Sequence, residues 1–318
     1  MEENPLWYII DSSKAKDYLE CPRKFWWRHI LGWEIDSPNI NLIFGEAFHK
    51  IPETLLLEGY TIAAIENGMK EFRRIYNATY NPLTDHERAP KNPAYAELAA
   101  LQYIQNYEDD LQKYEVLHTE ISGSVLVVPP DDRRITRIYF KMDSVLRDRE
   151  ANVVLSHEHK TTGQSFTQQY ANQWPMSFQV GTYSHVMRAF YDPETVYGVI
   201  INAISLKKTK FEFRRFPIRK TTPMMQVWWD IADRTLWNIE EDLNKFQEEW
   251  LDPGLTMESF PCNPQSCDRW YGCPYLDFCS TWANPITNAW SYLTEPPQGF
   301  RISFWDPRAI ETKEVMEL

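Results

Sequence analysis

The spacing of apolar residues changes along the chain, and this change restricts the fold more than any other feature of the sequence. In the first 114 residues, apolar side chains recur every three or four positions, which is typical of helices that pack on a core. The predicted helices are 12–30 with a restart at Pro22, 42–58, 61–77, the segment from Asn92-Pro93 to Tyr114, 170–191, and the helix around Trp229–Trp250. The predicted strands are 115–128, 135–148, 153–160, 195–206 and 210–216.

A block of helices, then strands, then alternating helices and strands indicates an α/β fold. We expect a mixed sheet flanked by helices, with an N-terminal helical layer and a C-terminal cysteine-rich lobe. The 318 residues are interpreted as a single domain. Its parts are a mainly helical segment 1–114, a sheet core 115–220, a long helix with a cysteine-rich segment 221–280, and a tail 281–318.

The net charge is −12, from 33 Lys and Arg against 45 Asp and Glu. This acidic balance argues against a passive nucleic-acid coat, which would be strongly basic. It does not exclude an enzyme that approaches phosphates through metal ions. No apolar run reaches the length of a membrane-spanning helix, and the N-terminus lacks the basic and apolar segments of a signal peptide. We therefore expect a cytoplasmic protein with no membrane partner.

Five cysteines are distributed unevenly along the chain. Cys21 lies alone, whereas Cys262, Cys267, Cys273 and Cys279 fall within 18 residues. An odd number of cysteines without a signal peptide argues against a disulfide framework. The pattern favours a metal or iron–sulfur site.

A four-residue turn, 149–152, joins two of the predicted strands. If it closes a hairpin, the facing positions place Asp143 opposite Glu158. Two carboxylates at that spacing repel one another unless a cation lies between them, and a hard divalent cation suits them. Lys160 lies two residues beyond Glu158 and projects from the same strand face. The alternative is that all three side chains simply face solvent.

Two acids and an ammonium group that converge in this way suit phosphodiester hydrolysis. A metal ion held by the acids polarises a phosphoryl oxygen and lowers the pKa of bound water. The lysine orients that water or stabilises the negative charge that develops. The hairpin thus contains a candidate hydrolytic site.

Met142-Asp143 is followed, after 14 residues, by Glu158-His159-Lys160, which resembles the PD-(D/E)XK nuclease signature with methionine in the proline position. Other motifs resemble those of the RecB-like nucleases, which include CRISPR-associated RecB-like exonucleases and related phage enzymes. In chain order they are Cys21-Pro22-Arg23-Lys24-Phe25, Gly45-Glu46-Ala47-Phe48-His49, Gln179-Val180-Gly181-Thr182-Tyr183 and Cys273-Pro274-Tyr275-Leu276-Asp277-Phe278-Cys279. The resemblance implies a restriction-endonuclease-like α/β fold.

The resemblance also implies a centre for Mg²⁺ or Mn²⁺. Its ligands would be the side chains of His49, Asp143 and Glu158, with a contribution from the backbone carbonyl of His159. The residues implied in catalysis are Asp143, Glu158, Lys160, Gln179 and Tyr183. The last two stand four positions apart, share one helix face and would line the substrate strand.

In the family resembled, one N-terminal and three C-terminal cysteines hold a [4Fe–4S] cluster, and four thiolates are the usual ligands of such a cluster. Cys21, Cys267, Cys273 and Cys279 would be the four here. The spacing departs from the common version, and Cys262 competes with Cys267. A zinc site built from the four C-terminal cysteines is the alternative.

Residues 207–220 carry seven bases and one acid, a net charge of +6 within an acidic chain. The predicted nucleic-acid ligands in this segment are Lys207, Lys208, Lys210, Arg214 and Arg215. The lysine and arginine side chains would follow phosphates, or they simply face solvent on a two-sided strand. The interleaved phenylalanines either stack on nucleobases or, as we favour, belong to the core.

The sequence predicts a metal-dependent DNA nuclease, foremost an exonuclease acting on single-stranded DNA or DNA ends. DNA repair, recombination or phage replication is the expected setting, with recombination, replication or CRISPR-associated proteins as partners. The alternatives are a DNA-binding or scaffolding subunit that retains the fold without activity, and an RNA-directed nuclease.

Overall fold

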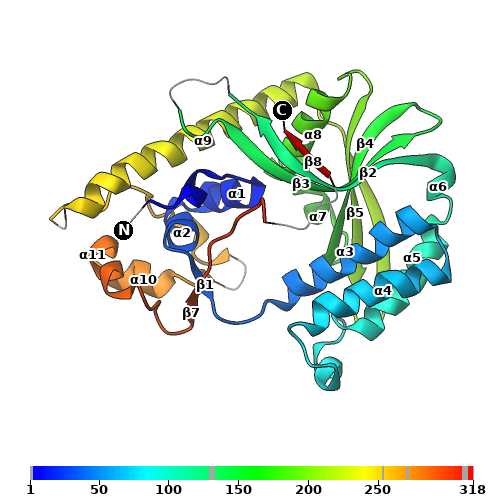
Figure 1. Ribbon diagram of the computed structural model, residues 1–318, viewed down its shortest axis with the longest axis horizontal. Coiled ribbons are helices and arrows are strands. Elements are labelled where there is room, and N and C mark those ends of the chain that lie inside the picture. The colour runs from blue at the N-terminus through cyan, green and yellow to red at the C-terminus, as the bar shows by residue number, and fades with distance from the viewer. Residues whose placement is uncertain (1–2, 129–132, 253, 270–271, 310–313, 318) are drawn as a thin grey trace.

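A six-stranded mixed sheet lies at the centre of the computed structural model, which describes residues 3–128, 133–252, 254–269, 272–309 and the backbone of 314–317 (Figure 1). The strand order is β6-β5-β4-β3-β2-β8. The strands are β2 (Tyr114–Leu126), β3 (Arg137–Asp148), β4 (Val153–Thr162), β5 (Val196–Leu206), β6 (Phe211–Ile218) and β8 (Glu314–Glu317). The β4–β5 and β2–β8 pairs are parallel and the other pairs are antiparallel.

Helices cover both faces of the sheet, as the sequence predicts. Short α7 (Gln168–Asn172) and α8 (Phe178–Phe190) connect β4 to β5, and α8 packs on one face through residues such as Val186. The opposite face carries α3 (Ile40–Glu58), α4 (Ile62–Asn77) and α5 (Pro93–Tyr107), whose apolar side chains pack with Ile204 and Leu206 of β5. A short α6 (Asp110–Lys113) precedes β2.

A second lobe combines an N-terminal segment with residues from the C-terminal third of the chain, whereas strand β8 near the C-terminus belongs to the main sheet (Figure 1). Its helices are α1 (Ser12–Glu20), α2 (Pro22–Phe25), a π-helix (Trp26–Ile30), α9 (Thr222–Leu251), α10 (Leu276–Thr281) and α11 (Pro285–Ala289). A two-stranded sheet pairs β1 (Trp33–Ile35) with β7 (Phe300–Ile302). The N-terminal helices therefore divide between the two lobes instead of forming one layer.

Buried tryptophans explain this division. Trp26, Trp27 and Trp33 are at most 1% exposed, and the Trp27 and Trp33 rings stack with centroids 5.1 Å apart. Together with Phe246 of α9 and Tyr275 they form a core distinct from that around the sheet. Burial of large rings is the main stabilising contribution that such a lobe has.

The predicted helices and strands are confirmed except at two places. The apolar periodicity of α5 continues to Tyr114, but the helix ends at Tyr107 and Tyr114 begins β2. The predicted helix 170–191 is broken between α7 and α8, where Pro175 lies. Proline removes a backbone donor and so interrupts helical hydrogen bonding.

The acids of α9 are partly structural. Glu240 accepts hydrogen bonds from the backbone N–H groups of Arg134 and Ile135, and Glu249 accepts from the hydroxyl of Ser259 at 2.6 Å. Both carboxylates are buried. These two carboxylates therefore hold neighbouring loops against α9.

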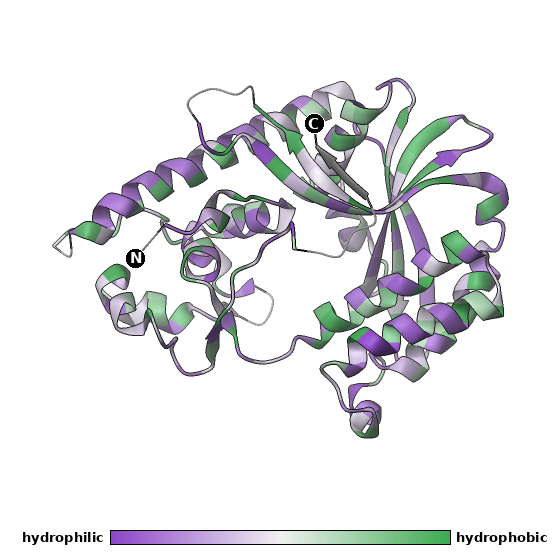
Figure 2. Cartoon of the chain, in the orientation of Figure 1, coloured by the Kyte–Doolittle hydropathy of each residue, from purple (hydrophilic) through white to green (hydrophobic). Residues whose placement is uncertain are grey.

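Figure 2 shows hydrophilic and hydrophobic residues alternating along α4 and α9, as expected for helices with one buried face. Among the helices that the structure describes, none is both long enough and apolar enough to cross a membrane.

Gly181, between the two polar residues of the Gln179–Tyr183 motif, allows α8 to approach α9. A Cβ atom at this position would lie 2.0 Å from Cδ1 of Trp228. We expect Gly181→Ala to lower the free energy of unfolding by about 1–3 kcal/mol, because overpacking outweighs the gain of about 1 kcal/mol in helix propensity. Thermal unfolding measures the change. Gly163→Ala is the control, since its Cβ meets no atom within 4 Å, and equal stability of the two variants would contradict the argument.

Candidate active site

Strands β3 and β4 separate at the predicted carboxylate pair. The hairpin register runs from Asp148 opposite Val153 to Ser144 opposite His157, which is the register that the four-residue turn predicts. Asp143 and Glu158 come next on their strands. Here Asp143 Oδ2 accepts the backbone N–H of His159 at 2.7 Å, so the two strands remain tied at the point of separation.

His49 reaches the same place from α3. Its Nδ1 lies 3.3 Å from Oδ1 of Asp143, so the helical histidine and the first acid are in direct contact. Both side chains are partly shielded, with 24% and 11% of their surfaces exposed. The structure thus brings together two residues 94 positions apart that the resemblance places in one metal centre.

Glu158 is held from two directions. Its Oε1 accepts hydrogen bonds from Lys160 Nζ at 2.5 Å and from Gln179 Nε2 at 3.0 Å. Gln179 also donates to the Tyr183 hydroxyl at 2.8 Å, and that hydroxyl donates to the backbone carbonyl of Lys141. The Gln179 and Tyr183 face of α8 therefore fixes both the second acid and strand β3.

The two carboxyl groups of the site have pKa values shifted in opposite directions. Burial and the nearby negative charge of Asp143 raise the pKa of Glu158 to about 7, although Lys160 opposes the shift. Burial alone would also raise the pKa of Asp143, but His49 and Lys160 hold that pKa well below its usual value. The pKa of His49 is raised because the two carboxylates outweigh its burial. One acid is thus ionised while its neighbour binds a proton readily.

Glu158 also supplies the observation that bears on a metal ion. Its second oxygen, Oε2, is buried and has no hydrogen-bond partner. A buried carboxylate oxygen without a partner costs free energy that a cation would recover. Imidazole and carboxylate donors suit Mn²⁺ and, with water, Mg²⁺. Within the part of the chain that the structure describes, however, no three His, Cys, Asp or Glu side chains form a group that would hold a metal ion as they stand.

The histidines beside Glu158 point away from it. His159 is 2% exposed, and its Nδ1 contacts the amide nitrogen of Asn202 at 3.1 Å. His157 is fully buried against the ring of Tyr114. The ring of His159 lies 6.1 Å from that of His49, and its Nε2 is buried without a hydrogen-bond partner, whereas its backbone N–H is bonded to Asp143.

Two buried acids near the site were not predicted. Glu120 lies between positions that pair with Ser144 and Met142, which places it beside Asp143, and it forms an ion pair with Lys141. Lys50 joins Glu120 and Glu53 at 3.9 and 2.9 Å. This network anchors α3 to β2 one residue from His49. His49 and Glu53 stand four positions apart and share one helix face, and this spacing could have indicated that Glu53 lies near the site.

The predicted basic residues differ in their surroundings. Lys208 and Arg214 are exposed, whereas Lys207 and Lys210 both lie near Glu212, at 3.7 and 2.5 Å. The phenylalanines between them pack against the two faces of the sheet, as favoured above.

Arg215 is committed to a structural contact. Its Nη1 donates to Asp110 Oδ1 at 2.7 Å and its Nη2 to Oδ2 at 2.5 Å. Its guanidinium group also covers the Tyr107 ring at 3.8 Å. Of the five predicted nucleic-acid ligands, Arg215 therefore has the least freedom to contact a phosphate.

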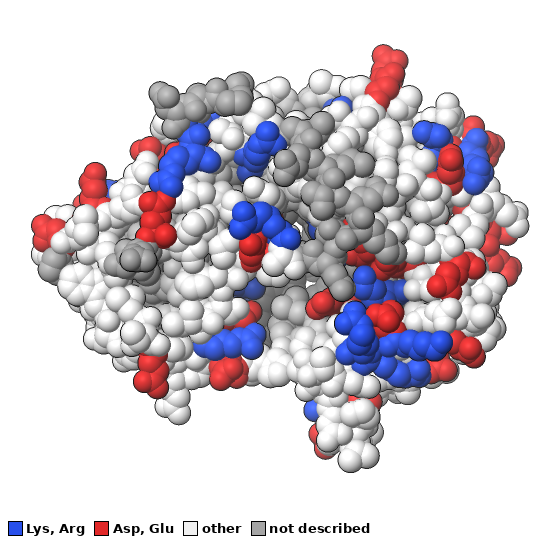
Figure 3. Space-filling view, viewed as in Figure 1, with Lys and Arg blue, Asp and Glu red and all other residues white. Residues whose placement is uncertain are grey.

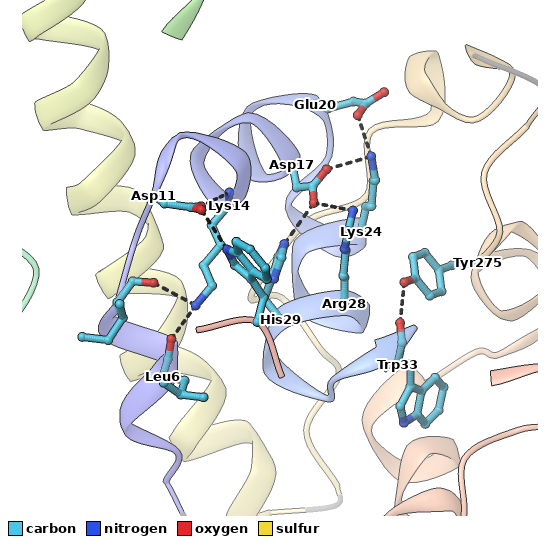
Figure 4. A network of polar contacts seen from close by, with 12 residues as sticks. Leu6, Asp11, Lys14, Asp17, Glu20, Lys24, Arg28, His29, Trp33 and Tyr275 are labelled. Atoms are coloured by element: carbon cyan, nitrogen blue, oxygen red, sulfur yellow. Dashed lines mark hydrogen bonds and ion pairs between the residues drawn. The ribbon is translucent and has the colours of Figure 1, made fainter. Parts of the chain in front are cut away.

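A cleft of about 570 Å³ lies between the lobes, lined by Tyr275 and the start of α3. Figure 3 shows Lys and Arg side chains on both sides of the hollow at the centre of this face. Lys24 and Arg28 also line the cleft, but both pair with Asp17, at 2.9 and 3.2 Å (Figure 4). Acids therefore largely neutralise the cations on that wall.

Cys21 and the four C-terminal cysteines all lie in the second lobe. The pKa of Cys262 is raised to about 12, first by burial and then by the neighbouring thiols of Cys279, Cys21 and Cys267. The thiols of Cys279, Cys267 and Cys21 likewise contribute to the raised pKa of Cys273, after burial. None of the five forms a disulfide. The five thiols are thus close enough to influence one another electrostatically, but among the described residues no three of them are arranged as a metal-binding group.

Polar groups surround the sulfur atoms. Cys21 Sγ accepts the backbone N–H of Asn263 at 3.3 Å, and Cys279 Sγ accepts Nε1–H of Trp27 at 3.3 Å. Buried Arg23 donates to the carbonyl of Phe260 at 2.8 Å. These donors and this positive charge suit thiolates, and an all-thiol donor set suits either iron–sulfur or zinc.

The site is of a nuclease type. It has acidic side chains on two adjacent strands and a lysine two residues beyond the second acid, and it lies on a mixed sheet that helices flank. Residues 12–280 match the family model of the PD-(D/E)XK nuclease superfamily, and the chain belongs to that superfamily. No curated protein matches the sequence significantly.

Two solved structures resemble the chain weakly. One is a candidate exonuclease from Eubacterium rectale, with 12% identity, a TM-score of 0.46, and coverage of 76% of this chain and 87% of that one. The other is SSO0001, with 11% identity, a TM-score of 0.29, and coverage of 71% and 82%. Both TM-scores are too low to support an argument, so the family assignment depends on the family model.

Proposed function

We propose that the protein is a metal-dependent DNA nuclease whose centre is the point where β3 and β4 separate. The observation that carries the proposal is the convergence of His49, Asp143, Glu158 and Lys160, with a buried oxygen of Glu158 left without a partner. Membership of the nuclease superfamily supports the same reaction class.

In this proposal His49, Asp143 and Glu158, with the carbonyl of His159, hold Mg²⁺ or Mn²⁺. The bound metal would polarise the phosphoryl oxygen and supply a water of lowered pKa. Lys160 stabilises negative charge on the phosphate. Gln179 and Tyr183 act as positioning residues, since one binds Glu158 and both fix the adjacent strand.

The finer assignments are also proposals. By resemblance we infer an exonuclease on single-stranded DNA or ends, acting in the cytoplasm in repair, recombination or phage replication. A [4Fe–4S] cluster on Cys21, Cys267, Cys273 and Cys279 would join residues 20–30 to the C-terminal part of the lobe.

A substrate panel tests the function. Labelled single-stranded and double-stranded DNA and RNA are incubated with the protein in Mn²⁺, Mg²⁺ or EDTA. We expect metal-dependent cleavage of DNA, with single strands or ends preferred. Cleavage of RNA alone would support the RNA-directed alternative. DNA binding without cleavage in any metal would support a scaffolding subunit.

The raised pKa of Glu158, about 7, predicts pH-dependent metal binding. Below that pKa the carboxyl group holds a proton that a metal ion must displace, so affinity for Mn²⁺ should rise with pH between 6 and 8 and then level off. Calorimetric titration in two buffers of different ionisation enthalpy should show net proton release on binding near neutral pH. Affinity that does not change with pH, together with no proton release, would contradict this assignment.

A further inference from the structure

A second groove opens beyond the candidate active site. It has a volume of about 630 Å³, and its walls are the segment 80–91 on one side and Gly163 with residues 206–208 on the other. Segment 80–91 includes the short 3₁₀ helix Pro82–Arg88. No motif in the sequence assigns a role to this segment.

The groove is strongly basic. Arg88, Lys91, Lys207 and Lys208 line it, with Glu87 as the one acid among its lining residues. Lys207 also lies 3.7 Å from Glu212, which leaves Arg88, Lys91 and Lys208 as the cations that make this groove basic within an acidic chain. Such a groove raises the local concentration of polyanions.

Two of these cations are held by neutral partners. Arg88 donates to the carbonyl and hydroxyl of Thr84, both at 2.8 Å, and lies over the Tyr80 ring at 4.6 Å. Lys91 donates to the side-chain oxygen of Asn41. Among the residues that the structure describes, neither Arg88 nor Lys91 forms a direct ion pair, unlike Lys24 and Arg28 in the cleft between the lobes. Burial raises the pKa of Asp85, and the nearby charge of Arg88 opposes that shift. Asp85 therefore offsets part of the positive charge of Arg88.

The groove adjoins the cleft between the lobes and lies near the proposed centre along the chain. Gly163 lies three residues beyond Lys160, which corresponds to about 10 Å along an extended chain. Pro38 and Ile40 line both this groove and the cleft between the lobes, and Ile40 begins the helix that carries His49. A strand that lies in the groove would therefore pass the end of β4 close to the active site.

We propose that this groove binds the phosphodiester backbone of a single DNA strand that continues from the active site, with Arg88, Lys91 and Lys208 as phosphate ligands. The inference rests on the proposed nuclease function and adds a binding surface on segment 80–91. Cations beside an apolar wall, here formed by Pro90 and Leu206, suit the phosphates and sugars of a single strand.

Binding without catalysis tests the groove. Fluorescence anisotropy of a labelled strand of about 20 nucleotides is measured in EDTA over a range of salt, for the full-length wild type and Lys91→Gln/Lys208→Gln. The slope of log K against log salt is negative, and each lost contact to single-stranded DNA should make it less steep by about 0.7. The slope of the double variant should therefore be less steep by about 1.4. If the two proteins bind equally at about 1 M salt, this change in slope makes the double variant bind about 25-fold more weakly at roughly 0.1 M salt.

Lys70→Gln/Lys245→Gln is the matched control, since both lysines are exposed and lie outside the groove on α4 and α9. Wild-type affinity and slope in the control, with both reduced in the groove variant, support the inference. If the wild type cleaves DNA but the groove variant binds like the control, the proposed role of the groove is wrong, while the proposed nuclease function is retained. If the wild type neither binds nor cleaves DNA, the proposed function and the groove fail together. The same titration with RNA shows whether the groove distinguishes the two nucleic acids.

Discussion

Asp143→Asn and Glu158→Gln are each expected to slow metal-dependent DNA cleavage about 10³-fold. Loss of a charged metal ligand removes several kcal/mol of transition-state stabilisation, and each 1.36 kcal/mol is a factor of ten in rate. Both substitutions keep the size of the side chain, so the fold should persist. Single-turnover cleavage at saturating enzyme measures the loss, and thermal unfolding verifies the fold.

Glu150→Gln is the control for this pair. Glu150 lies in the turn of the same hairpin, is exposed, and is eight residues from Glu158. It should retain wild-type cleavage. If Asp143→Asn or Glu158→Gln keeps more than about a tenth of the wild-type rate in a folded protein, the carboxylate does not act as a metal ligand.

The second large effect concerns the cysteines. If these residues hold the proposed cluster, Cys21→Ala and Cys279→Ala should each abolish iron incorporation and lower the melting temperature sharply, because the cluster would join the N-terminal segment to the C-terminal part of the second lobe. Iron and sulfide content and visible absorption of anaerobically purified protein give the direct readout.

Cys262→Ala and Cys267→Ala separate the remaining alternatives. The resemblance assigns Cys267 as a ligand, so Cys267→Ala should lose iron and Cys262→Ala should retain it. The reverse result would assign Cys262. A colourless wild-type protein with stoichiometric zinc would overturn the iron–sulfur proposal and favour the zinc site.

Local signals in the sequence predicted the centre of the site. The four-residue turn fixes the hairpin register, because a shift of one residue would move every side chain to the other face of the sheet. This is why the positions of Asp143 and Glu158 could be inferred before the structure was known. The apolar spacing similarly predicted α9, and Asn92-Pro93 predicted the start of α5.

Long-range pairing explains what could not be predicted. Arg215 pairs with Asp110, 105 residues earlier, so no local pattern reveals that its charge is already used. The position of Glu120 beside Asp143 depends on how β2 pairs with β3. The division of the N-terminal helices likewise depends on tryptophans that pack against α9, which comes almost 200 residues later.

Cleavage of labelled single-stranded DNA by the wild type and by Lys160→Met, in Mn²⁺ and in EDTA, tests the central claim most directly. We predict that the wild type cleaves only with the metal. Lys160→Met should still bind Mn²⁺ but cleave about 10²–10³-fold more slowly, because the group that stabilises charge on the phosphate is gone. A wild type without metal-dependent cleavage, or Lys160→Met with full activity, would contradict a hydrolytic centre at this position.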